Sequence, residues 1–204
     1  MNNQLRAEAS SFRDSAGKVF YWNNTVVRRV NKSYKMDYDL LMQSGLYDSL
    51  VSNKLLIPHE EIRDWKSFNI GNDEDIYLLL RPKKIDFISY PYEWSFSQLK
   101  DAALCTLKIL KISIEHKLIL KDCSAFNIQF NNGAAIFIDT LSFESYKEGQ
   151  PWQGYKQFCQ HFLAPLSLMA KVDIRLGETF KIFLDGIPLD FASKILGYKS
   201  YLSL

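Results

Sequence analysis

Apolar and polar positions near the start of the chain alternate as they do in β-strands. Residues 18–30 (KVFYWNNTVVRRV) make two such runs on either side of Asn23-Asn24, which predicts a hairpin with a short turn. From residue 38 to residue 56, apolar side chains instead return at helical spacing, and Gly45 interrupts them. We therefore expect a strand hairpin followed by two helical pieces.

Strand patterns resume after this helical segment. Residues 57–72 contain a proline, several charges and Gly71-Asn72, which predicts a strand and a loop. The runs 76–80 (IYLLL) and 86–94 (DFISYPYEW) are also typical of strands. A small sheet should therefore accumulate before residue 95.

A long helix is predicted to begin at this point. Ser95 and Gln98 fit a capping box, in which Ser95 accepts a hydrogen bond from the third helical amide and Gln98 reaches back to the cap. The helix should end near Glu115 or His116. Its apolar residues recur at helical steps and predict one buried stripe that consists of Leu99, Ala103, Leu107, Leu110 and Ile114.

The last third of the chain predicts a second hairpin and then helices. Residues 128–138 alternate around Asn131-Asn132-Gly133, whose residue types tolerate a positive φ. Residues 155–170 have a helical apolar face, which Pro165 is expected to kink, and two shorter helices should follow around Asp185-Gly186. This part is therefore predicted to be mainly helical.

No internal repeat, low-complexity linker or clear boundary divides the chain. We expect an α+β fold in a single domain over residues 1–204, with a β-rich lobe over residues 1–90 and a helical lobe over residues 91–204. The lobes should meet at Tyr90-Pro91-Tyr92, a candidate hinge.

Composition adds limits on class and partners. The chain has 204 residues, 47% hydrophobic and 24% charged, which is enough for a sizeable core. Its 25 basic and 23 acidic side chains leave a formal net charge of +2, so no strong field favours nucleic acid or an anionic membrane as a partner. Three cysteines lack zinc-type spacing, and no apolar run is long enough for a signal peptide or a bilayer span. We expect a soluble cytoplasmic protein.

Three polar residues of the second half form a candidate site: Asp122, Asn127 and Asp139. The spacing of the first two is weak support, because two other Asp and Asn pairs in the chain share it. Their setting is more specific, since a long helix precedes them, an apolar hairpin follows, and Asp139 ends that hairpin. Carboxylate and amide oxygens suit a metal-phosphate site. Each residue alone could equally cap a turn, hold a loop or end a strand.

This order of helix, Asp-x4-Asn loop, hairpin and terminal Asp resembles the catalytic half of the protein kinase and aminoglycoside phosphotransferase superfamily. The resemblance implies a two-lobed, protein-kinase-like fold that binds ATP and Mg²⁺ between its lobes. Asp122 would then position the acceptor hydroxyl as the catalytic residue, while Asn127 and Asp139 would hold Mg²⁺ on the nucleotide phosphates.

The same resemblance also implies contacts with the adenine and with the phosphates of the nucleotide. Adenine is expected beside residues 89–93, where Tyr90 and Tyr92 belong to the interlobe linker. Arg29 or Lys121 would offset phosphate charge. Ordinary alternatives are a solvated surface charge for Lys121 and a plain strand position for Arg29.

Several positions depart from the kinase pattern. Leu120 stands where kinases place a His, and Asp139 is followed by Thr140-Leu141 instead of Phe-Gly. The first hairpin has no G-x-G-x-x-G, and the phosphate-pairing lysine has no clear match, with Arg28 and Arg29 as the nearest cations. The match is therefore one of residue type and order.

A second resemblance covers most of the chain. It looks like a bacterial family known as nodulation-protein-related proteins or as SAM-dependent methyltransferases, through segments that include DYDLLMQSGLYDSL, FISYPYEWSFSQLKDAAL, FIDTLSFE and PWQGYKQFCQHFLAPLSLMA. In that family the methyltransferase usually follows the region resembled here. None of the nine glycines forms the strand-linked G-x-G of a SAM-binding turn, so we expect any methyltransferase to lie outside this chain.

Two further features have competing interpretations. Cys123 adjoins Asp122 and could be a nucleophile, although no evident base is in register with it. A group of aromatic residues is expected to form helix-packing core, but with Gln157 and Gln160 it could line an acceptor pocket. These aromatic residues are Trp152, Tyr155, Phe158 and Phe162.

Two functional hypotheses follow, with a structural domain as the plainest third. In the first, the chain is a kinase-like phosphotransferase that moves the ATP γ-phosphoryl group to a hydroxyl of a small molecule or saccharide. In the second, it is a catalytically inactive kinase-like binding module that accompanies a SAM-dependent methyltransferase. The missing Gly-rich loop and lysine motivate the second hypothesis.

Overall fold

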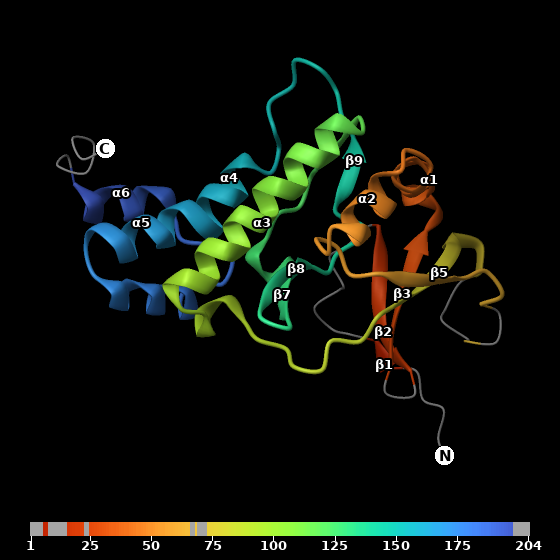
Figure 1. Cartoon of the computed structure of the whole chain (residues 1–204), viewed down its shortest axis with the longest axis horizontal. Coiled ribbons are helices and arrows are strands. Elements are labelled where there is room, and N and C mark those ends of the chain that lie inside the picture. The colour runs from red at the N-terminus through yellow and green to blue at the C-terminus, as the bar shows by residue number, and fades with distance from the viewer. Residues whose placement is uncertain (1–5, 8–15, 23–24, 66–67, 69–72, 198–204) are drawn as a thin grey trace.

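An antiparallel sheet formed by the first half of the chain is followed by helices (Figure 1). The computed structural model describes residues 6–7, 16–22, 25–65, 68 and 73–197. This arrangement confirms the α+β class. The sheet has five strands in the order β1-β2-β3-β5-β4, which are β1 (Arg6–Ala7), β2 (Gly17–Trp22), β3 (Thr25–Asn31), β4 (His59–Ile62) and β5 (Ile76–Pro82).

Strands β2 and β3 form the first predicted hairpin. Their antiparallel register runs from Gly17 opposite Val30 to Trp22 opposite Thr25. The predicted turn residues, Asn23-Asn24, lie outside the described residues. Val30 is completely buried, so the inward face of this hairpin lies on the core.

The predicted helical segment forms α1 (Lys35–Gln43) and α2 (Leu46–Ser52), preceded by a 3₁₀ turn over Lys32–Tyr34. Gly45 separates the two helices with a φ of 77°, a left-handed conformation that glycine adopts without a Cβ penalty. The prediction of two pieces is confirmed, although α2 ends at Ser52, before residue 56.

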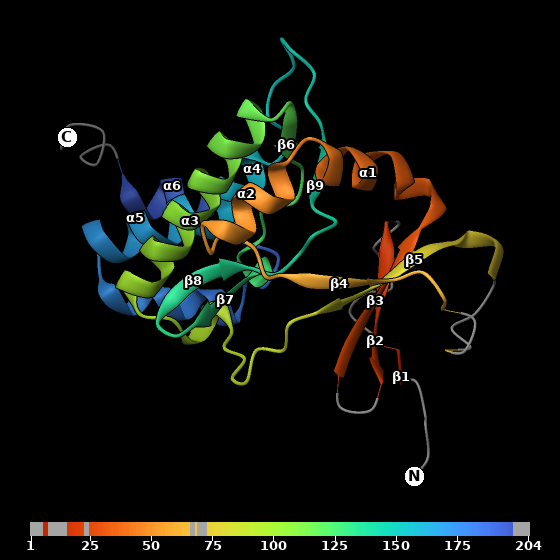
Figure 2. The same ribbon diagram turned by 45° about the vertical axis from the view of Figure 1, so that its right-hand side comes forward.

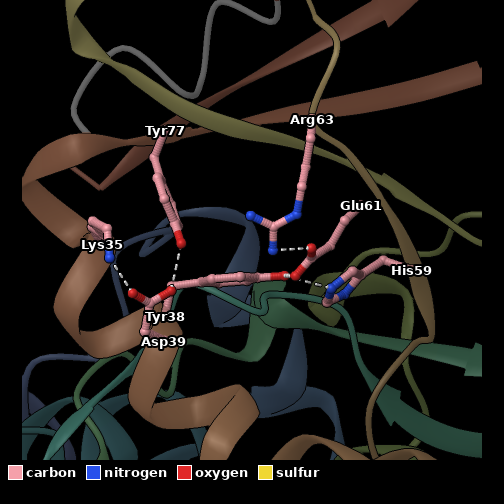
Figure 3. Close-up of polar contacts among 7 residues, drawn as sticks. All are labelled: Lys35, Tyr38, Asp39, His59, Glu61, Arg63 and Tyr77. Carbon is pink, nitrogen blue, oxygen red and sulfur yellow. Dashed lines mark hydrogen bonds and ion pairs between the residues drawn. The ribbon is translucent and has the colours of Figure 1, made fainter.

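Helix α1 is fastened to the sheet by polar side chains (Figure 3). The Tyr38 hydroxyl donates to Glu61 on β4 at 2.9 Å and lies 3.0 Å from His59 Nε2. The Tyr77 hydroxyl on β5 donates to Asp39 at 2.6 Å, and Asp39 also pairs with Lys35. These contacts fix the orientation of α1 against β4 and β5.

The segment that joins β5 to the helical half is not a strand. Residues 86–94 contain only a 3₁₀ turn, Pro91–Glu93, in place of the predicted strand. Pro91 has no N–H to give to a ladder, and the Ser89 peptide is bonded by a side chain instead of a neighbouring strand. The apolar residues of this run therefore indicated a strand wrongly.

Helix α3 (Phe96–Glu115) begins with the predicted capping box and ends where expected. The Gln98 amide donates to Ser95 Oγ at 3.3 Å, and the Ser95 amide donates to Gln98 Oε1 at 3.0 Å. The predicted buried stripe is partly wrong, because Leu107 is 41% exposed and Ile114 is 40% exposed. The face that packs on the neighbouring strands consists of Leu99, Ala102, Ala103, Cys105, Thr106, Ile109 and Ser113.

Two small strand pairs lie beside α3 (Figures 1 and 2). Strand β6 (Leu118–Leu120) pairs with β9 (Phe143–Ser145), and β7 (Ile128–Asn131) forms the second predicted hairpin with β8 (Ala134–Phe137). Asn132 and Gly133 close this hairpin with φ values of 52° and 80°. Both values lie in the left-handed region, so the predicted turn is confirmed.

The remaining chain is helical, as predicted. A π-helical segment, Cys159–Leu163, separates α4 (Tyr155–Phe158) from α5 (Ala164–Lys171). Pro165 lies in the first turn of α5, where its missing N–H is tolerated, so the irregularity precedes the proline. A 3₁₀ segment (Ile174–Lys181) and α6 (Leu189–Leu196) follow. Among the described residues, no helix combines the length and the apolar character needed to cross a membrane.

The main hydrophobic core is shared by the two halves. Leu41, Leu46 and Leu50 of α1 and α2 are fully buried together with apolar residues of α3, β6, β7 and β9. The chain after α2 also bonds to the second hairpin, since the Phe137 amide donates to Leu55 at 2.8 Å. The division into lobes at residue 90 stays a prediction.

Candidate functional site

An ion pair joins the sheet to the end of the second hairpin. Arg28 Nη1 on β3 lies 2.5 Å from Asp139 Oδ1, and the two side chains are only 13% and 14% exposed. The Leu141 amide also donates to Asp139 Oδ1 at 2.7 Å. Asp139 thus ends the hairpin as predicted, and its carboxylate faces a cation on the opposite half of the molecule.

Arg29, the predicted phosphate contact, is not brought to Asp139. Successive residues of a strand point to opposite faces, so Arg28 and Arg29 separate. The Arg29 Nε donates to Asn31 Oδ1 at 2.8 Å, and the residue is 9% exposed. The structure therefore places Arg28, and not Arg29, beside the predicted metal ligand.

Ser142 connects the other predicted residues. Its hydroxyl accepts from Asn127 Nδ2 at 3.4 Å, and its amide donates to the Asp139 carbonyl at 3.4 Å. Its carbonyl accepts from the Lys121 amide at 2.8 Å. Because Ser142 is 1% exposed, these bonds hold the Asp-x4-Asn loop against the end of the hairpin.

Asp122 is held by its own loop and by α4. Its Oδ1 accepts from the Ser124 amide at 3.1 Å and from Gln157 Nε2 at 2.8 Å. Gln157 Oε1 accepts from the Cys123 backbone amide at 2.7 Å. Gln157 therefore fixes the orientation of Asp122.

The oxygens left over at this site fit a hard cation in chemical type. In the described part of the chain, the hydrogen bonds to the Asp122 carboxylate, the bond from the Leu141 amide to Asp139 and the closest contact of Asp139 with Arg28 all involve Oδ1. The Asn127 side chain donates through Nδ2, and its Oδ1 would be the atom that binds a ligand. Carboxylate and amide oxygens are what Mg²⁺ prefers, so Asn127 and Asp139 fit the predicted metal role. Asp139 would share its charge between Arg28 and the metal.

Lys121 lies over an aromatic ring. Its Nζ is 4.3 Å from the centroid of Tyr34, a cation–π contact. The Tyr34 hydroxyl donates to the Phe143 carbonyl. The pKa of Tyr34 is raised well above its usual value, mainly by burial and secondly by the nearby Asp139 carboxylate. Lys121 is thus held next to the predicted site through Tyr34.

The tyrosines of the linker stack on each other. The rings of Tyr90 and Tyr92 are 5.3 Å apart with an interplanar angle of 10°, and Tyr90 is 44% exposed. A cavity of about 720 Å³ touches Tyr92 and extends toward residues 174–181. Its lining does not include Asp122, Asn127 or Asp139, so this cavity lies apart from the predicted catalytic residues.

Cys123 is not placed as a nucleophile. Burial raises the pKa of its thiol to about 12, and Sγ donates to the Gly154 carbonyl at 3.1 Å. All three cysteines are free and buried. His161 lies on the π-helical segment, where burial lowers its pKa and its Nδ1 lies 3.4 Å from the Ala125 amide. It supports the loop that follows Asp122.

Metal binding by protein carboxylates and imidazoles alone is not favoured. No group of three or more His, Cys, Asp or Glu side chains is placed to hold a metal ion in the described residues. A cation at Asn127 and Asp139 would therefore need oxygens of a bound phosphate, as Mg²⁺ commonly does.

A comparison with curated proteins finds a similar nodulation protein. Nodulation protein NoeA of Rhizobium meliloti (strain 1021) is 32% identical over 195 residues, which cover 96% of this chain. The chain is therefore similar in sequence to a nodulation protein. This confirms the resemblance to nodulation-protein-related proteins. The chain spans 40% of the length of NoeA, and no protein-family model matches it.

Comparison with solved structures shows a kinase. The structure of vaccinia related kinase 3 matches with a TM-score of 0.40 and 12% identity, over 70% of this chain and 52% of that chain. The elements on which the expected kinase pattern rests are those described above: a sheet, a linker, a long helix, an Asp-x4-Asn loop and a hairpin that ends in Asp139.

Some site residues have little sequence signal. Ser142 and Gln157 belong to no motif, and only the fold brings them to Asn127 and Asp122. Tyr34 lies just after β3 and contacts a lysine far along the chain. Arg28 had a signal, since it neighbours Arg29 in a predicted strand, but strand alternation does not say which of two adjacent residues faces a partner.

Proposed function

We propose that this chain is a kinase-like domain that holds a magnesium-bound nucleotide at Asn127 and Asp139 and transfers a phosphoryl group to a hydroxyl at Asp122. The observation that carries the proposal is the set of bonds around Ser142, which joins the Asp-x4-Asn loop to Asp139, together with Arg28 on the carboxylate of Asp139. Arg28, the carboxylate of Asp139 and the side-chain amide of Asn127 are thereby connected at the junction of the two halves, which supports the proposal.

Each residue has a distinct role in the proposed reaction. Bound Mg²⁺ would neutralise charge on the phosphates. Asn127 and Asp139 would hold the metal through oxygens, and Arg28 would lie beside the same charge as a guanidinium that stays protonated. Lys121, placed by Tyr34, is the second cation near the site.

Asp122 is the proposed acceptor-positioning residue. Its Oδ2 would accept the hydrogen of the acceptor hydroxyl while Gln157 holds Oδ1. The hydroxyl oxygen then forms a bond to the γ-phosphorus, the bond to the bridging oxygen breaks, the proton passes to Asp122, and the nucleoside diphosphate leaves. The proposed acceptor is a small molecule or saccharide.

The test is magnesium-dependent ATP hydrolysis, with water as a substitute acceptor, combined with nucleotide binding. We expect Asp122→Asn to reduce turnover at least 100-fold while binding is retained, because the side chain acts on the acceptor. Asp139→Asn should weaken both. Asp173→Asn, which breaks an exposed pair with Arg175, is the matched control and should change neither. Unchanged turnover in Asp122→Asn would contradict the catalytic assignment.

A second function is favoured by one specific observation. NoeA extends well beyond the region that this chain matches, since the chain covers 40% of its length. This supports a non-catalytic kinase-like module that accompanies a SAM-dependent methyltransferase, fused or separate. Binding to such an enzyme, together with no measurable affinity for any nucleotide or for inorganic tripolyphosphate, would favour this function over phosphoryl transfer.

A further inference from the structure

The linker between the sheet and α3 is held by a glutamine side chain. Gln129 Oε1 accepts from the Ser89 amide at 3.0 Å, and Gln129 Nε2 donates to the Ser89 carbonyl at 3.0 Å. Gln129 is 3% exposed and lies on β7, two residues after Asn127. A side chain of β7, the strand that follows the proposed metal loop, thus makes a two-bond contact with one peptide of the linker.

This contact is local to Ser89. Its hydroxyl also accepts from Trp94 Nε1 at 2.9 Å, so the backbone and the side chain of Ser89 are both bonded. The neighbouring side chains are exposed instead, with Phe87 at 77% and Ile88 at 48%. General burial of the segment therefore does not explain why Ser89 is held on three sides.

The hydrogen-bonding pattern matches that of a nucleobase. A glutamine amide presents an N–H donor next to a carbonyl acceptor. Adenine presents the same pair, an amino N–H beside a ring nitrogen that accepts. A backbone N–H and C=O of one residue complement either group. Gln129 therefore fills, with its own amide, the linker position at which adenine was expected.

We infer that Gln129 is a specificity-determining residue that closes the Ser89 edge of the linker to a purine base. The inference rests on the proposed function, because it concerns how the same site treats a nucleotide. It follows that the protein holds the polyphosphate and the metal without recognising the base through Ser89. Compounds with the same phosphate chain should then bind alike, whatever base they carry.

A purely structural role for Gln129 predicts a different result. In that case, removal of the amide lowers stability and leaves ligand selectivity unchanged. If Gln129 blocks the base, its removal frees the Ser89 N–H and C=O, and selectivity for adenine rises. The ratio of two affinities separates the two roles, since a loss of stability affects both ligands together.

The experiment measures dissociation constants for Mg-ATP and for magnesium tripolyphosphate by calorimetry. The variants are Gln129→Ala and Gln129→Met, of which the second keeps side-chain volume if the first fails to fold. Gln98→Ala, which removes a comparable amide at the start of α3, is the matched control. We expect a ratio near one in the wild type and in Gln98→Ala, and a preference for ATP of about tenfold in Gln129→Ala, the effect of one two-bond base contact.

The other outcomes are distinguishable. A wild-type preference for ATP that disappears in Gln129→Ala, or equal binding of both ligands in every variant, overturns the inference and leaves the proposed phosphate site intact. ATP binding that appears only when Gln129 is replaced supports the inference. Failure of every variant to bind either ligand overturns the proposed function, and the inference with it.

Discussion

Arg28 and Asp139 form a nearly buried ion pair across the junction between the antiparallel sheet and the second hairpin. One residue lies in the middle of β3, and the other follows β8 after more than a hundred residues of chain. The pair therefore has two consequences. It stabilises the relative position of the two halves, and it sets the charge that a metal at Asp139 would meet.

The first prediction concerns the stability of this pair. Arg28→Met should lower the free energy of unfolding by about 2–4 kcal/mol, because it leaves the Asp139 carboxylate largely buried without its cation. Denaturant unfolding measures the change. Arg81→Met is the control, since Arg81 pairs with Glu60 at 3.5 Å on the surface and should change stability by less than about 1 kcal/mol.

A double variant sharpens this prediction. Arg28→Met combined with Asp139→Leu removes both charges, so its loss of stability should be smaller than the sum of the two single losses. Additive losses would show that the two side chains do not interact in solution.

The second prediction is a pH dependence that originates at His59. Burial lowers its pKa from the ordinary 6.5 to about 4 in the folded protein. The unfolded chain therefore binds a proton between these values that the folded chain does not, and stability falls as the pH falls from 6.5 toward 4. The loss over this window should be roughly 2–3 kcal/mol, at about 1.4 kcal/mol for each pKa unit.

Urea unfolding at several pH values between 7 and 4 measures this effect. His59→Gln, which cannot gain the proton, should lose less stability over the same window. Glu61 also contacts the Tyr38 hydroxyl beside His59, and both proteins retain Glu61. The difference in stability loss between the wild type and His59→Gln therefore isolates the titration of His59. An equal loss in both proteins would exclude His59 as the origin.

The third prediction concerns the reactivity of Cys123. A thiol whose pKa is about 12 is almost entirely protonated at pH 8, and the buried Sγ is bonded to the Gly154 carbonyl. A disulfide reagent should therefore modify Cys123 in the native protein at least 100-fold more slowly than in the unfolded chain. Peptide mapping identifies the modified residue. Rapid modification of Cys123 under native conditions would revive the nucleophile hypothesis.

Local sequence patterns predicted elements well where one segment determines its own structure. The capping box of Ser95 and Gln98 places the start of α3, because both bonds form within one turn. The turn of Asn132 and Gly133 follows from their tolerance of positive φ.

Predictions were wrong where packing partners decide the outcome. The helical periodicity predicted that Leu107 lies on the buried face of α3. In the structure, β6 and β8 pack on α3, and its buried residues include Ala102 and Ile109. The run 86–94 looks like a strand, but Ser89 bonds to the side chain of Gln129, forty residues later. Neither partner is visible in the pattern of the segment itself.

The residues of the candidate site could likewise be predicted only in part. Asp122, Asn127 and Asp139 could be selected from their order along the chain, and the structure links Asn127 and Asp139 through Ser142. The groups that orient them could not be selected, because Gln157 reaches Asp122 only through the packing of α4. Their roles in metal and phosphate binding stay predictions.

The measurement that tests the central claim most directly is the melting temperature with and without Mg-ATP. It should be made on the wild type, on Asp139→Asn, and on Asn127→Ala, which keeps the Arg28 pair; each protein is compared with its own ligand-free form. Ligand at about 100 times its dissociation constant adds roughly 2.7 kcal/mol, which raises the melting temperature of a chain of this size by several degrees. We predict such a rise in the wild type, its loss when Mg²⁺ is chelated, and its absence in both variants. A rise that persists in both variants, or no rise in the wild type, would contradict a metal-phosphate site at Asn127 and Asp139.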